Sequence, residues 1–149
     1  MANSDPFHET KENLQTVQRE YTATNSINAA TAYTIAHTAE TAVRNFFTFA
    51  TGANFPYGQF PHHVPEKIVA ELGLLQFYSP EMKVFLAKMT GYALQDVRFE
   101  NTQAFKHHTD VKAIGRGKYL VDGLTQFVEE TVELQNNAGA LQRLKSWKP

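Results

Sequence analysis

The strongest constraint on the fold is a helical repeat of apolar residues between Asn25 and Ala50. Apolar side chains recur there at intervals of three and four residues, which places them on one face of a long α-helix. They are Ile35, Ala39, Ala42, Val43, Phe46, Phe47 and Ala50. Asn25 or Ser26 is predicted to cap the N-terminus of this helix, and Gly52 stands where a helix commonly ends in the left-handed conformation.

Sparser repeats of the same kind predict four further helices. The first begins after Asp5-Pro6, a short one covers 63–72, the next covers 79–93, and the last covers 111–135. The sequence contains no alternating apolar and polar run that is long enough for a strand. We therefore predict an all-α fold, an antiparallel four-helix up-and-down bundle with an additional short helix.

Two segments show no sustained helical repeat. The stretch 95–110 is predicted to be a long loop, and loops of that length within a compact domain often carry function. The basic tail, 136–149, either extends the last helix or remains loose. The length of 149 residues fits a single domain over 1–149, with a core over about 5–135.

Composition excludes several classes of protein. The 14 Lys and Arg residues balance 15 Asp and Glu, so no overall positive field favours long stretches of nucleic acid. The absence of cysteine excludes disulfide frameworks, thiolate nucleophiles and iron–sulfur clusters. The sequence has no signal-peptide pattern at its start and no apolar run near the roughly 20 residues of a membrane helix, so we expect a cytoplasmic protein with no membrane partner.

His37, Glu40 and Arg44 form the first candidate site. Their spacing places all three on one face of the predicted long helix. One interpretation is a solvated stripe with a Glu40–Arg44 ion pair. The other is a cleft in which Arg44 binds a phosphate, while Glu40 orients a partner residue or accepts a hydrogen bond from a sugar hydroxyl.

The second candidate site is the segment 96–101, at the start of the predicted long loop. It brings together Asp96, Arg98, Phe99 and Asn101. An arginine that binds phosphate and an aromatic ring that stacks on a base suit nucleotide recognition. The same residues also fit a structural role, in which Arg98 satisfies carbonyl groups at a helix end and Phe99 closes the core.

Histidine pairs at 62–63 and 107–108 raise the question of a metal site. Helical di-iron proteins are marked by Glu-x-x-His on two helices, and this chain has no Glu-x-x-His. Adjacent loop histidines are more often exposed polar residues than ligands. We therefore expect no metal and no cofactor, while a proton-transfer role for His107 or His108 stays open.

The order of these features resembles the HEPN family, the helical nucleotide-binding domains of higher eukaryotes and prokaryotes. The run 36–44 looks like that family's second long helix, with alanines and a glutamate before an alanine, an aliphatic and a basic residue. Gly52 and then His63-Val64 are similar to the elements that follow that helix. The segment 96–100 resembles the Arg-Tyr-Pro element of one branch.

This resemblance implies a helical, dimeric protein with a cleft for a nucleotide or a partner. The cleft would lie near Glu40, Arg44, His63 and Arg98. In the predicted site, Arg44 and Arg98 contact phosphate, Phe99 stacks or shapes the pocket, and Glu40 pairs with Arg98. Noncatalytic members commonly accompany a nucleotidyltransferase in toxin–antitoxin or defence systems, so the resemblance implies such a protein partner.

Departures from the family pattern argue against RNA cleavage. Phe99 and Glu100 stand in place of the Tyr and Pro. Ribonuclease members carry an Arg-x4–6-His motif, whereas eight residues separate Arg98 from His107 here. A nucleotide- or partner-binding protein is therefore the favoured prediction. The alternatives are a metal-independent ribonuclease with a diverged Arg/His site and a purely structural homo-oligomeric domain.

Overall fold

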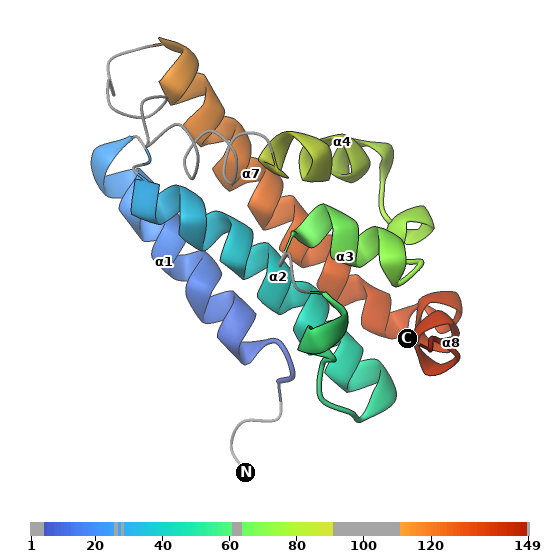
Figure 1. Cartoon of the computed structure of the whole chain (residues 1–149). Helices are drawn as coiled ribbons and strands as arrows, with labels where there is room; N and C mark the ends of the chain where they lie inside the picture. The colour runs from blue at the N-terminus through green and yellow to red at the C-terminus, as the bar shows by residue number, and fades with distance from the viewer. Residues whose placement is uncertain (1–4, 26, 28, 61–63, 91–110, 149) are drawn as a thin grey trace.

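The computed structural model describes residues 5–25, 27, 29–60, 64–90 and 111–148 (Figure 1). At 29 and 111–116 it describes the backbone alone. This part of the chain contains α-helices and short 3-10 turns and no strand, which confirms the predicted all-α class. The α-helices are α1 (His8–Thr24), α2 (Ala29–Thr51), α3 (Pro65–Glu71), α4 (Pro80–Met89), α7 (Val111–Glu133) and α8 (Ala138–Lys145).

Helix α2 is the element around which the others pack. Helices α1, α3, α7 and α8 all contact α2, while α4 packs on α7 and α3 (Figure 1). The side chains of Phe46, Phe85 and Phe127 from α2, α4 and α7 are fully buried in the shared core. Within the described residues, no helix combines the length and the apolar character that crossing a bilayer requires.

The turn between α1 and α2 differs from the predicted one. Asn25 does not cap α2, because it adopts the left-handed conformation with φ 54° and closes α1 instead. Its backbone N–H donates to the Tyr21 carbonyl at 2.6 Å. Asparagine tolerates this conformation better than most residues, which explains its position at a helix end. The alternative cap, Ser26, lies outside the described residues.

Residues with strong local preferences end and begin the other helices, and Gly52 does so as predicted. Gly52 and Gly73 each have φ +73° just beyond α2 and α3, a conformation that glycine adopts without steric cost. Ser79 caps α4, because its hydroxyl oxygen accepts from the Met82 backbone N–H at 3.3 Å, and Pro80 is the first residue of the helix. The predicted continuation to 93 and the predicted loop 95–110 extend into the part of the chain that is not described.

The C-terminal segment forms a separate helix. Helix α7 is followed by a 3-10 turn, Leu134–Asn136, and the Asn137 side chain then caps α8 by accepting from the Ala140 N–H at 3.0 Å. Leu144 of α8 is buried against the rest of the protein. The tail therefore neither extends α7 nor remains loose, because a cap and an apolar face make it a helix of its own.

Candidate functional site

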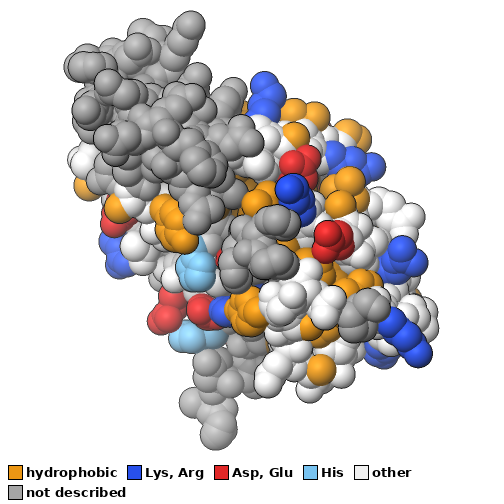
Figure 2. Space-filling view, in the orientation of Figure 1, with side chains coloured by type: hydrophobic (Ala, Val, Ile, Leu, Met, Phe, Trp, Pro, Cys, Tyr) orange, Lys and Arg blue, Asp and Glu red, His pale blue; other side chains and the backbone are white. Residues whose placement is uncertain are grey.

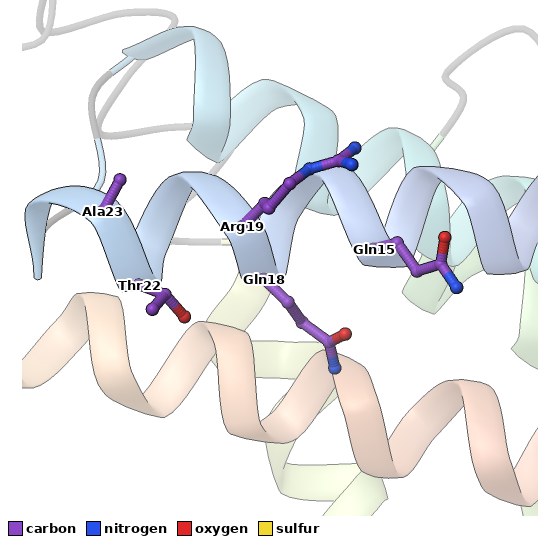
Figure 3. A pocket seen from close by; sticks show the side chains of 5 residues that line it. All are labelled: Gln15, Gln18, Arg19, Thr22 and Ala23. Atoms are coloured by element: carbon purple, nitrogen blue, oxygen red, sulfur yellow. The ribbon is translucent and has the colours of Figure 1, made fainter.

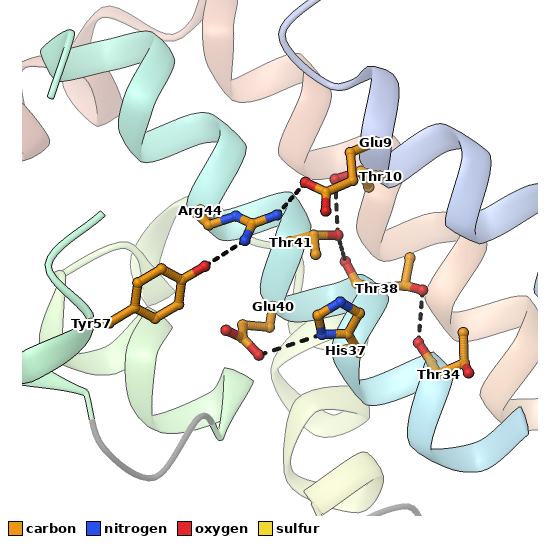
Figure 4. Close-up of polar contacts among 9 residues, drawn as sticks. All are labelled: Glu9, Thr10, Thr34, His37, Thr38, Glu40, Thr41, Arg44 and Tyr57. Carbon is orange, nitrogen blue, oxygen red and sulfur yellow. Dashed lines mark hydrogen bonds and ion pairs between the residues drawn. The ribbon is translucent and has the colours of Figure 1, made fainter. Parts of the chain in front are cut away.

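Three of the eight predicted site residues lie in the described part, all on α2. His37 is exposed, Glu40 is buried, and Arg44 is half-buried. The His37 Nδ1 and Glu40 Oε1 atoms are 3.8 Å apart, as expected for neighbours on one helix face (Figure 4). The other five lie outside the described residues, and they are His63, Asp96, Arg98, Phe99 and Asn101.

Arg44 pairs with residues from other elements and not with Glu40. One guanidinium nitrogen, Nη2, forms an ion pair with the Glu9 carboxylate in the first turn of α1, and the other, Nη1, donates to the Tyr57 hydroxyl (Figure 4). The interpretation as a Glu40–Arg44 pair is therefore wrong. Because α1 packs on α2, the Glu9 carboxylate lies next to α2, and the Arg44 side chain turns toward it.

Tyr57 reaches Arg44 because the aromatic segment after α2 folds back. The 3-10 turn Tyr57–Gln59 presents the phenol to α2, and the Arg44 Cζ atom lies 6.0 Å from the centre of the Tyr57 ring. Phe55 fixes this turn, because its ring packs edge-on against Tyr57 at 5.2 Å and stacks on Phe60 at 5.1 Å. A buried aromatic anchor thus holds the partially exposed phenol in place.

The electrostatics of the site keep Arg44 charged. Partial burial lowers the pKa of the guanidinium, but the hydrogen bonds with Tyr57 and Glu9 outweigh it, so the pKa is raised above its ordinary value. A guanidinium presents donors in a planar fork that matches carboxylate and phosphate groups. Arg44 therefore provides a permanent positive charge and a directional donor.

A row of hydroxyl groups ties α1 to α2 beside Arg44. The buried Thr10 hydroxyl contacts Asn45 Oδ1 at 2.7 Å. It also lies 3.1 Å from Thr41 Oγ1, and Thr41 donates to the Thr38 carbonyl at 2.8 Å (Figure 4). Thr10 and Thr41 are fully buried. Because these bonds cross between the helices, they fix the position of the Asn45 amide as well as the start of α1.

These groups surround an open hollow of about 530 Å³, which we call the Arg44 hollow. It is lined by Pro6, Glu9, Arg44, Asn45, Thr48, Phe49, Asn54, Phe55 and Tyr57. Phe49 and Tyr57 are 44% and 39% exposed, so both present aromatic surface to solvent. Figure 2 shows charged, histidine and hydrophobic side chains gathered together on the face formed by α1 and α2. The hollow offers a cation, amide and hydroxyl donors, and aromatic surfaces to one ligand.

Two other hollows lack this combination. One of about 500 Å³ lies along α1 and is lined by Gln15, Gln18, Arg19, Thr22 and Ala23 (Figure 3). It has no aromatic residue, and Gln18 is engaged with Thr125 of α7 at 3.1 Å. The other, of about 450 Å³ between α4 and α7, is lined by two carboxylates and no cation. The Arg44 hollow is therefore the best candidate site of the three.

Sequence reasoning found Arg44 but missed its partners. Glu9 and Tyr57 are 35 and 13 residues away from Arg44 in the chain, and no motif links them to it. The Gly-, Pro- and aromatic-rich stretch 51–61 was the one available signal for Tyr57. Thr10 and Asn45 carry no signal, because single Thr and Asn residues are common on helices.

Within the described residues, no group of three or more His, Cys, Asp and Glu side chains is arranged to hold a metal ion. Comparisons with protein-family models, curated proteins and solved structures give no match to this chain.

Proposed function

We propose that this protein binds a nucleotide in the Arg44 hollow. One observation carries the proposal: a charged, half-buried guanidinium is held beside exposed aromatic rings on the wall of a hollow. Nucleotides combine a phosphate, which a guanidinium recognises, with a base, which stacks on aromatic rings for about 1–3 kcal/mol. Few other common ligands require both groups together.

Each part of the hollow has a role in this proposal. Arg44 and the Asn45 amide nitrogen donate to the phosphate, since the Asn45 oxygen is already engaged by Thr10. The exposed faces of Phe49 and Tyr57 receive the base. Asn54, also on the wall, can hydrogen-bond to a base edge or a sugar hydroxyl.

The proposal includes the antiparallel four-helix up-and-down bundle and the cytoplasmic location that the sequence pattern predicts. It also includes the homodimer and the nucleotidyltransferase partner that the HEPN resemblance implies. Arg98 and Phe99 would extend the site, and RNA is not the favoured ligand. These elements remain predictions.

Binding of nucleotides to matched variants tests the proposal. Isothermal titration of the full chain with each of the four ribonucleoside 5′-monophosphates should give saturable binding to the wild type. Arg44→Gln should weaken it at least about tenfold, because a charge-assisted bond to phosphate is lost. The control is Arg19→Gln, which changes an exposed arginine whose bond is to Thr16 on its own helix.

Two results would contradict the proposal. One is the absence of binding by any of the four nucleotides, which would favour a site for a protein partner. The other is equal weakening by Arg44→Gln and Arg19→Gln, which would mean that only the overall charge of the chain matters.

A further inference from the structure

We infer that Glu9 is the specificity-determining residue of the Arg44 hollow. Its carboxylate occupies the place on the Arg44 guanidinium that a ligand phosphate takes, and it leaves when a phosphate binds. Glu9 thereby sets how strongly the hollow distinguishes a nucleotide from the corresponding nucleoside. This inference rests on the proposed nucleotide-binding function.

The two partners of Arg44 contact different nitrogens of its guanidinium. Tyr57 engages Nη1 and Glu9 engages Nη2. Carboxylate and phosphate oxygens use the same donors of a guanidinium, so a phosphate competes directly with Glu9. Tyr57 contacts the other nitrogen through its hydroxyl, and this contact can persist during the exchange. Arg44 therefore stays in place while its anionic partner changes.

Exposure makes Glu9 the partner that can be exchanged. The Glu9 side chain is 51% exposed, whereas that of Arg44 is 25% exposed. Ion pairs that are open to water contribute little to stability, because water and salt screen them. A phosphate dianion that also gains neighbouring donors can therefore displace a single exposed carboxylate.

The backbone on both sides of Glu9 is anchored, so the exchange requires a side-chain rotation alone. Phe7 is fully buried just before α1, and its N–H donates to Asp5 Oδ1 at 2.9 Å. Thr10 is also fully buried and is bonded to Asn45. Glu9 can swing into solvent without unwinding the first turn of α1.

Departure of Glu9 leaves donors on α2 that suit a phosphate. Asn45 and the exposed Thr48 flank Arg44 on the wall of the hollow, and both carry side-chain donors. The first turn of α1 also favours negative charge, because the helix dipole is positive at this end. Both a resident carboxylate and an incoming phosphate benefit from this field, which makes them alternatives for one location.

The test compares charge removal at Glu9 with the same change one turn away. Glu9→Gln keeps the size of the side chain and removes its charge. Glu12→Gln is the matched control, because Glu12 is on the same helix and pairs with His8 and not with Arg44. Each variant and the wild type are titrated with the four ribonucleoside 5′-monophosphates and, separately, with the four unphosphorylated ribonucleosides.

We expect Glu9→Gln to bind the monophosphates about fivefold more tightly than the wild type, with nucleoside affinity and the Glu12→Gln variant unchanged. Monophosphate affinity that is unchanged or weaker in Glu9→Gln would overturn the inference while leaving nucleotide binding intact. An equal gain for nucleosides would also overturn it, because the gain would not depend on the phosphate. Failure of every protein to bind any probe would overturn the proposed function and this inference together.

Discussion

Two glutamates, Glu9 and Glu130, join pairs of helices in this protein in opposite ways. Glu130 of α7 accepts three hydrogen bonds: from the Ser79 N–H at 2.9 Å, the Ser79 hydroxyl at 2.7 Å and the Gln126 amide at 2.8 Å. Among the residues that the structure describes, Glu9 of α1 has Arg44 as its one polar partner, and it is half exposed on the wall of a hollow. The three hydrogen bonds of Glu130 fix the start of α4. In the inference above, Glu9 exchanges its one ion pair for solvent when a phosphate binds.

The surroundings of the two carboxylates differ in the same sense. Between α4 and α7, Phe85 lies directly over Gly123 at the edge of the hollow of about 450 Å³. The buried Tyr78 hydroxyl, just before α4, bonds to Thr131 of α7 at 2.7 Å. Between α1 and α2 a row of threonine hydroxyls lies beside the open hollow. Close packing and the bonds to Glu130 hold α4 on α7, whereas in the proposed function the α1–α2 contact provides the place for a ligand.

Among the substitutions that test this comparison, Gly123→Ala should have the largest effect on the free energy of unfolding. A Cβ atom at Gly123 would lie 2.2 Å from Phe85 Cδ1, so the helices must shift, and the free energy of unfolding should fall by about 1–3 kcal/mol. Gly117→Ala on the same helix is the control, because its Cβ would meet Tyr21 at an ordinary 3.4 Å. Since alanine favours helix, that variant should be neutral or up to about 1 kcal/mol more stable. Urea unfolding measures both, and equal destabilisation would contradict the close α4–α7 contact.

A smaller effect is expected from Thr10→Val in the α1–α2 contact. The substitution keeps the shape of the side chain but removes the hydroxyl that bonds to Asn45, and it should cost about 1 kcal/mol of unfolding free energy. It should also weaken nucleotide binding, because the Asn45 amide loses the bond that orients it. Urea unfolding and titration with monophosphates check the two effects. The control is Thr16→Val, at a half-buried threonine whose hydroxyl donates to the Glu12 carbonyl of its own helix. A loss of stability with unaltered nucleotide affinity would separate Asn45 from the site.

The smallest effect concerns the pH dependence of stability due to Glu130. Partial burial raises the pKa of this carboxyl, but the bonds from Ser79 and Gln126 outweigh it, so the pKa lies below its ordinary value. A lowered folded-state pKa stabilises the protein fully above the unfolded value of about 4.3, and this contribution is lost as the pH falls through the folded value. Glu130→Gln should therefore cost about 1 kcal/mol or less at pH 7 and progressively less in acid.

Urea unfolding of the wild type and Glu130→Gln between pH 7 and pH 3 measures this difference. Glu129→Gln is the control, because the neighbouring Glu129 is exposed. A difference between wild type and Glu130→Gln that does not shrink toward low pH would show that the charge of Glu130 is not what stabilises α4.

The helices were predictable from sequence because their signals are local. Ser79-Pro80 begins α4, and Gly52 and Gly73 end α2 and α3, through bonds and conformations within a few residues. Asn25 misled the prediction for the same reason: its side chain suits either end of a helix, and the sequence alone does not show which helix it serves. The helix after Asn137 was missed because its apolar face is short and becomes decisive only when packed on α2.

The candidate site was only partly predictable because its contacts depend on packing. The sequence placed His37, Glu40 and Arg44 on one face, and the first two are neighbours. It could not show that Arg44 would turn toward Glu9 and Tyr57, since that outcome depends on how α1 and the aromatic turn meet α2. The predicted contributions of Arg98 and Phe99 remain predictions.

The most direct test of the central claim is to locate nucleotide binding on the protein by NMR. Backbone amide shifts of the isotope-labelled full chain are followed while the ribonucleoside 5′-monophosphates are added. We expect saturable shifts in the first turn of α1, in α2 near Arg44 and Thr48, and in the segment 54–57. Saturable shifts that are confined to the α4–α7 contact or to 96–101, or the absence of any, would contradict binding in the Arg44 hollow.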